Sequence, residues 1–292
     1  VGHPEQIAAL FGGETPLEIL LSPLEKRMEY NVEWPRPIDK DFETARDFYI
    51  TPEAAASLSE IDDTLDESRS TLVFVNVRPL AELLGSRLAM VRTDVGVHPG
   101  SLPREERERV AAGFKEGTIK GLVSTSTLEL GIDLGSIDRV VQYMSPRQVT
   151  SFIQRVGRSG HTLERTSKGT ILAVSADDAI ESVAVVEAAE AKDLEPLHVH
   201  ANALDVLAHQ IVGAALDQGG TARFDKIVEL IRGAGPYHGL DREQAAKVAE
   251  FLDHLGVLRR QGEDVRVTSK GRNYYYENLS TIRDERRYPV VD

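Results

Sequence analysis

The chain has 292 residues, of which 41% are hydrophobic and 28% charged, and its formal net charge is −13. This length allows two ordinary domains, and the composition is typical of folded protein rather than disorder. The absence of cysteine excludes disulfides, thiolate metal sites and cysteine nucleophiles. No apolar run approaches the roughly 18 residues that span a bilayer and no signal-peptide pattern opens the sequence, so we expect no membrane partner and a cytoplasmic location. The negative charge argues against binding nucleic acid by bulk attraction, so any such surface must be locally basic.

Residues 1–70 are predicted to be a lead-in: a strand at Lys26–Trp34, then a polar, acidic linker through Asp62–Ser70. From Thr71 onward, short apolar strands alternate with amphipathic helices. The expected strands are Thr71–Val77, Val95–His98, Ile119–Ser124, Arg139–Met144 and Thr170–Ser175, and the expected helices are Pro79–Leu88 and about 103–116. Strands buried on both faces and separated by helices predict an α/β domain with a doubly wound parallel sheet at residues 71–192.

A different pattern begins near Asn202, after a boundary at about 192–201. Three helical stripes occur, at 204–216, 224–231 and 241–255, and Asp241 with Gln244 resembles a capping box that opens the third. Two short strands follow, Val257–Arg260 and Val265–Thr268. Three helices and a β-hairpin predict a winged-helix domain at residues 200–280, and residues 281–292 are expected to start a further linker.

The segment from Ser145 to His161 is the most informative part of the sequence. Its apolar residues form one helical stripe, and Gln154, Arg155 and Arg158 lie on the opposite side, with the two arginines one turn apart. Two guanidiniums that project together suit a polyanion, because arginine offers planar, bidentate donors to phosphate. Taken alone, a solvated helix face with ordinary ion pairs explains the segment as well.

Residues 124–133, Ser-Thr-Ser-Thr-Leu-Glu-Leu-Gly-Ile-Asp, follow directly on a predicted strand. Hydroxyl groups at the carboxyl edge of a parallel sheet can donate to phosphate, and ligands bind open α/β sheets at this edge. Gly131 allows a close backbone approach, and Asp133 can accept from a ribose hydroxyl. The alternative is a hydroxyl-rich loop that caps a helix through Thr127.

The sequence resembles superfamily 2 helicases in four motifs. Residues 124–133 are similar to motif V, 154–161 to motif VI, 71–78 to motif IV, and 98–101 with Arg104 to motif IVa. The segments Leu-Glu-Leu-Gly-Ile-Asp and Gln-Arg-Val-Gly-Arg-Ser-Gly-His resemble those of the large helicase-related (Lhr) family. Residues 204–212, Leu-Asp-Val-Leu-Ala-His-Gln-Ile-Val, resemble the same family. The resemblance covers nearly the whole chain.

The resemblance implies a second RecA-like domain and a winged helix, from a motor that uses ATP with Mg²⁺ to move 3′→5′ on single-stranded or forked DNA and unwind duplexes. Arg158 is then expected to be the arginine finger on the γ-phosphate, with Gln154 and Arg155 as companions. Gly131 and Asp133 are expected at the nucleotide. The expected nucleic-acid contacts are Asn76, Arg78, Ser101, Arg104, Ser124 and Thr125. Many superfamily members have a second finger arginine where this sequence has His161.

The nucleotide-binding motifs of the first RecA-like domain do not occur. There is no Gly-Lys dipeptide and hence no Walker A loop, and neither Asp66-Glu67 nor Asp284-Glu285 ends a hydrophobic strand as a Walker B pair does. We therefore expect that this first domain is missing, that the chain is a fragment, and that it does not hydrolyse ATP alone. ATP with Mg²⁺ is then expected to be bound mainly by the missing domain.

The winged helix offers cations at Arg259, Arg260, Lys270 and Arg272 that could touch phosphates, although a scaffold that closes the DNA channel is the favoured role. The run Tyr274-Tyr275-Tyr276 suits either base stacking or, preferably, core packing. Two other functions stay open. One is an RNA or RNA–DNA hybrid helicase; the other is a winged-helix transcription regulator with an inert α/β domain, against which motifs V and VI argue.

Overall fold

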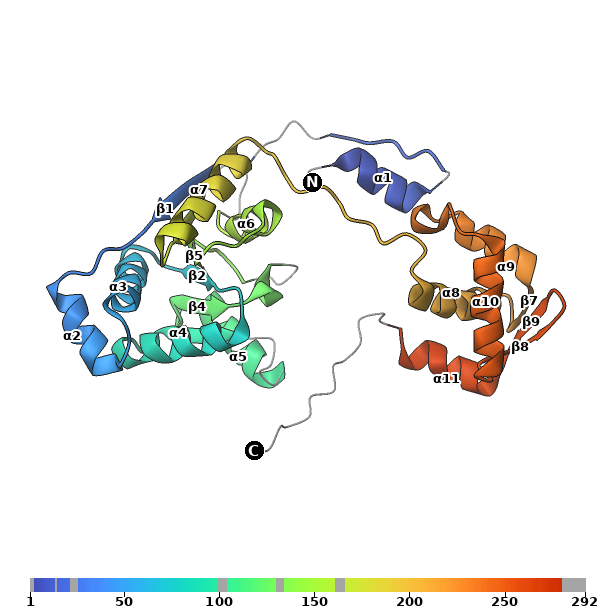
Figure 1. Ribbon diagram of the computed structural model, residues 1–292. Coiled ribbons are helices and arrows are strands. Elements are labelled where there is room, and N and C mark those ends of the chain that lie inside the picture. The colour runs from blue at the N-terminus through green and yellow to red at the C-terminus, as the bar shows by residue number, and fades with distance from the viewer. Residues whose placement is uncertain are drawn as a thin grey trace. The chain divides into compact units, whose positions relative to one another are not determined.

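A computed structural model describes residues 3–13, 15–21, 26–98, 104–129, 134–160 and 166–279 (Figure 1). It divides the chain into two compact units. The α/β unit comprises residues 22–195, and the C-terminal unit comprises residues 3–21 together with the chain from Pro196 onward. No helix within the described ranges is long and apolar enough to cross a bilayer.

The α/β unit is built on a six-stranded sheet in the order β1-β6-β5-β2-β4-β3, and all neighbouring strands pair in parallel. Its strands are β1 (Met28–Glu33), β2 (Thr71–Phe74), β3 (Val95–His98), β4 (Gly121–Ser124), β5 (Arg139–Tyr143) and β6 (Ser167–Leu172). Its helices are α2 (Asp39–Phe48), α3 (Pro52–Glu67), α4 (Arg78–Val91), α5 (Arg104–Glu116), α6 (Val149–Val156) and α7 (Ala176–Glu190), with a short 3-10 turn η1 (Ser126–Leu128). The predicted doubly wound parallel sheet is confirmed.

Two apolar layers enclose this sheet, one on each face. Side chains alternate along β2, because successive residues of a strand point to opposite faces. Leu72 and Phe74 join the layer under α5, α6 and α7, whereas Val73 and Val75 join the layer under α3 and α4. Both faces of the sheet are therefore buried, and the positions that a ligand can reach lie at the ends of the strands.

The acidic linker predicted through Asp62–Ser70 is wrong, since residues up to Glu67 are the last turns of α3. Thr51 caps this helix by accepting from Ala54 N at 3.2 Å. The acids face outward, and Arg92 Nη1 donates to Asp62 and Asp66 at 2.9 and 2.7 Å. The prediction followed the high acid content and overlooked an apolar stripe of this helix, in which Ile61 and Leu65 are fully buried.

Other boundaries differ from the sequence-based expectation. The strand predicted at 26–34 forms as β1, but it pairs with β6, so the compact unit begins at 22 rather than at 71. The last strand ends at Leu172 rather than Ser175, because Ser175 is the N-cap of α7 and accepts from Asp178 N at 3.2 Å. Helix α6 occupies only part of the segment from Ser145 to His161: it starts at Val149, after Arg147, whose φ of 62° is incompatible with a right-handed helix.

The C-terminal unit confirms the winged-helix plan. It contains α1 (Pro4–Gly12), α8 (Leu204–Asp217), α9 (Phe224–Arg232), α10 (Arg242–His254) and α11 (Ser269–Glu277), a 3-10 turn η2 (Gly235–Tyr237), and the antiparallel strands β7 (Thr221–Arg223), β8 (Leu258–Gln261) and β9 (Asp264–Val267). Gly262, at φ 61°, permits the tight turn between β8 and β9. The expected capping box is absent, because the Asp241 side chain makes no capping hydrogen bond. Helix α1, which packs on η2, was not predicted from the sequence, and neither were β7 and α11.

Candidate nucleotide and nucleic-acid interface

The polar residues singled out in the sequence gather where β2, β4 and β5 end. Asn76 follows β2, Ser124 ends β4, and Gln142 lies near the end of β5. Parallel strands present their carboxyl ends at one edge, which is where open α/β sheets bind ligands. Helix α6, with Arg155 near its C-terminus, packs against this same sheet.

Arg155 is buried, with only 5% of its surface exposed. Its Nε donates to Glu129 Oε1 at 2.7 Å, and its Nη1 donates to Gln142 Oε1 at 2.6 Å and to Asn76 Oδ1 at 3.2 Å. The Glu129 carboxylate is also largely buried, at 13% side-chain exposure, so a low-dielectric ion pair joins motif V to motif VI. The prediction that Arg155 projects outward beside Arg158 is therefore wrong, because protein acceptors already occupy its guanidinium.

Asn76 and Gln142 complete this buried network. Asn76 Nδ2 donates to Ser145 O at 2.8 Å, and Gln142 Nε2 donates to Met144 O at 2.9 Å. The amide of Asn76 is thus engaged on both sides, by Ser145 and by Arg155. Its geometry fits a residue that fixes the strand ends better than one that reaches a nucleic-acid phosphate.

Arg158 differs from Arg155 in its burial and in its hydrogen-bond partners. It lies two residues beyond the end of α6 and is half-buried. Across the ranges that the structure describes, its guanidinium has no hydrogen bond or ion pair with a protein group. Burial lowers the pKa of the nearby Lys26 ammonium, and the positive charge of Arg158 lowers it further. A half-buried cation that has no carboxylate partner in these ranges and lies beside a second cation favours an incoming anion.

The other expected contacts divide into three groups. Ser124 is fully buried and its hydroxyl donates to His98 O at 3.0 Å, which contradicts the expected direct contact with phosphate. Thr125 is half-buried, Gln154 is exposed, and Arg78 is exposed with its Nε donating to Glu82 at 2.7 Å. Gly131, Asp133, Ser101 and His161 lie outside the described residues, and so does the side chain of Arg104, the first residue of α5.

Sequence reasoning missed Glu129, Gln142, Lys26 and Glu195. Gln142 did carry a signal, because it is a polar residue inside the apolar strand Arg-Val-Val-Gln-Tyr and therefore needs buried partners. Glu129 also stood inside the motif V resemblance, between two leucines. Lys26 and Glu195 gave no signal, since their contacts with the helix α6 region come from 131 and 46 residues away.

The cations of the winged helix are mostly engaged within the protein. Arg259 Nη1 donates to Asp253 at 3.1 Å, Arg260 stacks over the Phe224 ring at 4.3 Å, and Lys270 Nζ donates to Leu255 O at 2.9 Å. In the tyrosine run, Tyr274 and Tyr275 pack against the core and Tyr276 is exposed. The imidazole of His209 stacks on the Tyr275 ring, with centroids 4.4 Å apart.

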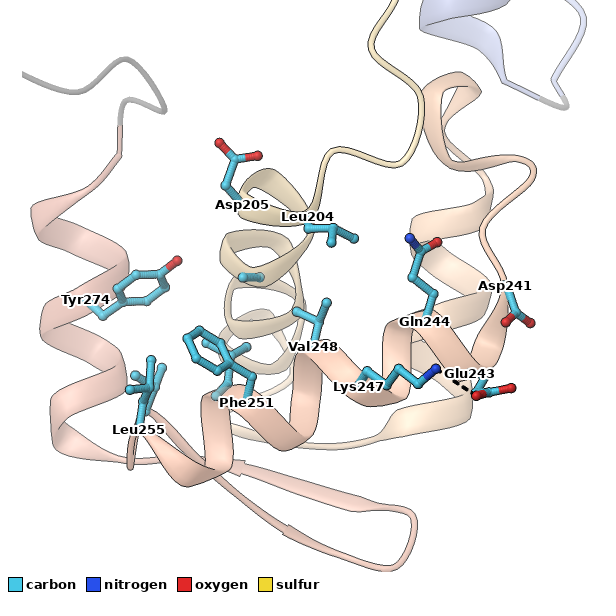
Figure 2. A pocket seen from close by; sticks show the side chains of 13 residues that line it. Leu204, Asp205, Asp241, Glu243, Gln244, Lys247, Val248, Phe251, Leu255 and Tyr274 are labelled. Carbon is cyan, nitrogen blue, oxygen red and sulfur yellow. Dashed lines mark ion pairs between the residues drawn. The ribbon is translucent and has the colours of Figure 1, made fainter.

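The C-terminal unit also contains a groove of about 980 Å³ between α8, α10 and α11 (Figure 2). Figure 2 shows Val248, Phe251 and Leu255 along it and the acids Asp241 and Glu243 at one end. The single lysine among its lining residues, Lys247, is paired with Glu243 at 2.8 Å. The acids Asp205, Asp241 and Glu243 among its lining residues make this groove unfavourable for phosphate.

Two protein-family models match the chain. Residues 55–162 match the helicase conserved C-terminal domain, and residues 187–261 match the winged helix domain of large helicase-related proteins. The first match covers most of the α/β unit, and the second begins in α7 and covers α8, α9 and α10. The chain is thus a superfamily 2 helicase C-terminal region, a RecA-like domain followed by a winged helix.

The individual relatives narrow this class to one family. The chain is 34% identical to the ATP-dependent helicase Lhr-Core of Methanocaldococcus jannaschii, over 84% of the chain and 30% of that protein. It is 31% identical to a Mycolicibacterium smegmatis protein described as Lhr helicase/probable uracil glycosylase, over 86% of the chain and 18% of that protein. A solved structure of Mycobacterium smegmatis helicase Lhr bound to ssDNA and AMP-PNP aligns with a TM-score of 0.83 and 28% identity, covering 96% of the chain and 37% of that one. The chain belongs to the large helicase-related (Lhr) family, and it spans less than a third of either of these two relatives.

Proposed function

We propose that the chain is the C-terminal motor half of an ATP-dependent helicase that moves 3′→5′ along DNA. It acts with a first RecA-like domain of the same protein, which holds most of the ATP and its Mg²⁺. The observation that supports this most directly is the contrast between two arginines one turn apart: Arg155 is buried in a protein network, and Arg158 is left unpaired within the described residues.

Arg158 is the arginine finger in this proposal. Its planar fork donates to the γ-phosphoryl group as negative charge develops there, and fingers of this kind contribute about 10³–10⁵ in rate. Gln154, which is exposed on the preceding turn, lies next to the same nucleotide. Gly131 and Asp133 contact the nucleotide from motif V. The solved structure of M. smegmatis helicase Lhr contains AMP-PNP, which supports nucleotide binding by a protein of this family.

Nucleic-acid contact is assigned to Arg78, Ser101, Arg104 and Thr125, which hold the phosphates of the tracking strand. Asn76 and Ser124 instead position the ends of the strands beside this contact. The ssDNA in the M. smegmatis structure supports a single-stranded track. The winged helix serves as a scaffold rather than a base reader, because Arg259, Arg260 and Lys270 are engaged internally.

The test compares the chain alone with the chain joined to a first RecA-like domain from an Lhr-Core relative. We expect no ATP turnover from the chain alone and DNA-stimulated turnover from the joined protein. Arg158→Ala should abolish that turnover while leaving binding of single-stranded DNA nearly unchanged, and Arg158→Lys should restore little, because an ammonium cannot replace a planar fork. The matched control is Arg46→Ala, an exposed arginine of α2, which should have no effect.

Three results would change the conclusion. Normal turnover by Arg158→Ala would show that the finger is another residue. Unwinding that proceeds only on an RNA track, or only against an RNA–DNA hybrid, would favour the RNA or hybrid helicase. Tight binding to one DNA sequence that is insensitive to Arg158 would favour the transcription regulator.

A further inference from the structure

Helix α6 is held at each end by a side chain from a distant part of the α/β unit. That unit extends from residue 22 to Glu195, so Lys26 lies close to where the chain enters it and Glu195 is where the chain leaves it. Lys26 contacts the turn that follows the C-terminal end of α6, and Glu195 contacts the N-terminal end. The helix that leads into Arg158 is thus connected to both boundaries of the unit.

Lys26 fixes the backbone on both sides of Arg158. Its Nζ donates to Gly157 O at 3.1 Å and to Ser159 O at 2.6 Å, which are the two neighbours of Arg158. Carbonyl groups at a helix C-terminus have no partner inside the helix, and a cation placed there also complements the negative end of the helix dipole. One ammonium therefore satisfies two carbonyls of the turn that carries Arg158.

Glu195 performs the complementary task at the other end of α6. Its carboxylate accepts from Val149 N at 2.5 Å, from Thr150 N at 3.0 Å and from the Thr150 hydroxyl at 2.6 Å. The N-cap residue Gln148 makes no side-chain capping bond, so Glu195 takes that role from outside the helix. Burial acts to raise the pKa of Glu195, but these hydrogen bonds outweigh it and lower the pKa to about 2.

The turn after α6 has further supports that leave the Arg158 side chain untouched. Ser159 Oγ donates to Val156 O at 2.8 Å and accepts from Lys168 N at 3.0 Å. Gly160 N donates to Ile137 O at 3.0 Å. The backbone at Arg158 is therefore rigidly placed, while its guanidinium has no partner among the described residues. Such preorganisation matters for catalysis, because a misplacement of about 1 Å can cost about 10²-fold in rate.

We propose that Lys26 and Glu195 are positioning residues that hold α6 by its two ends and so fix the place from which Arg158 reaches its phosphate. This inference rests on the proposed role of Arg158. Neither residue contacts the nucleotide; each acts through the helix. Because they stand at the entry and exit of the α/β unit, a displacement of either boundary segment moves the finger directly.

The first test uses the 292-residue chain as it is and needs no ATP turnover. Hydrogen exchange is measured at the amides of Gly157, Arg158 and Ser159, which bond to carbonyls of α6. Lys26→Met should speed exchange at these amides about tenfold, Glu195→Gln should speed it less, and Lys26→Arg, which keeps the charge and the donors, should retain most of the protection. The controls are Lys168→Met on β6 and Glu187→Gln on α7, both exposed. Unchanged exchange in Lys26→Met would overturn the inference whatever the enzyme does.

The second test measures turnover in the chain joined to a first RecA-like domain. Lys26→Met should lower kcat about tenfold with little change in the KM for ATP or in the melting temperature. In the Arg158→Ala background it should cost nothing further, because a positioning residue acts only through the residue that it positions. A full loss by Arg158→Ala with normal kcat in Lys26→Met and Glu195→Gln overturns this inference alone. No loss by Arg158→Ala overturns the proposed function, and the inference with it.

Discussion

The two arginines of motif VI should respond to the same substitution in opposite ways. Arg155→Ala removes the partner of a Glu129 carboxylate that is only 13% exposed, and it leaves Gln142 Oε1 without its 2.6 Å donor. Breaking a buried ion pair from one side costs about 3–5 kcal/mol, because the remaining charge stays buried without compensation. Asn76 and Gln142 still contact each other at 3.4 Å, so the lower figure, about 3 kcal/mol, is the better expectation.

This loss converts into a melting temperature that can be measured. For a domain of about 150–250 residues, 1 kcal/mol corresponds to roughly 2–4 °C, so Arg155→Ala should melt about 6–12 °C lower. Arg158→Ala breaks no interaction among the described residues and should stay within about 2 °C of the parent, as surface substitutions do. The assay is thermal unfolding of the α/β unit, followed by circular dichroism.

A double-mutant cycle isolates the pair itself. Glu129→Ala alone should also destabilise strongly, whereas Arg155→Ala combined with Glu129→Ala should cost clearly less than the sum, since no uncompensated charge then remains. Equal melting temperatures for Arg155→Ala and Arg158→Ala would refute the reasoning. So would strict additivity in the cycle, because it would mean that the 2.7 Å contact between Arg155 and Glu129 carries no coupling energy.

Three further outcomes are expected. The pKa of Glu195 is about 2 in the folded state and roughly 4.3 in the unfolded state. The ionised carboxylate therefore stabilises the fold fully above about pH 4.3, and this stabilisation is lost as the pH falls toward 2. In denaturant titrations from pH 5 to pH 2, the free energies of unfolding of the parent and of Glu195→Gln should converge. Gly213→Ala should destabilise the C-terminal unit by about 1–3 kcal/mol, because its Cβ would lie 2.6 Å from the Tyr275 ring, whereas Gly239→Ala, with nothing within 4 Å, should cost little. Binding of single-stranded DNA should weaken with salt at a slope of about −0.7 for each phosphate neutralised, which for about three contacts is near −2; a much steeper slope in anisotropy titrations would mean a broader basic surface.

Local pattern was sufficient for the strands of the α/β unit and for the class of fold. The apolar runs around Val73, Val123 and Val141 can form only strands that are buried on both faces, and those strands require a parallel sheet. Helix α3 was missed because six of its sixteen residues are Asp or Glu, and mean polarity says nothing about which side of a helix they occupy. The orientation of these acids depends on Arg92, a tertiary partner that lies 30 residues from Asp62 and 26 residues from Asp66.

The candidate site could be located from the sequence but not resolved into roles. Periodicity places Arg155 and Arg158 one turn apart and treats them alike, yet their environments depend on acceptors far along the chain. Arg155 faces Asn76 and Gln142, 79 and 13 residues away, and Glu129 lies 26 residues away. Nothing within α6 itself signals that these acceptors exist, so only the tertiary fold distinguishes a structural arginine from an available one.

The net charge of −13 is compatible with a local positive site, because many of the arginines are paired with carboxylates. Arg69, Arg92, Arg155 and Arg259 are each neutralised by a carboxylate within 3.1 Å. Paired cations contribute little to the long-range potential, so Arg158, which has no partner among the described residues and lies beside Lys26, is a local positive charge against a negative background. In the proposed motor, this arrangement would confine the attraction for anions to the place where charge develops during the reaction, because screening limits its reach to about 8 Å at physiological ionic strength.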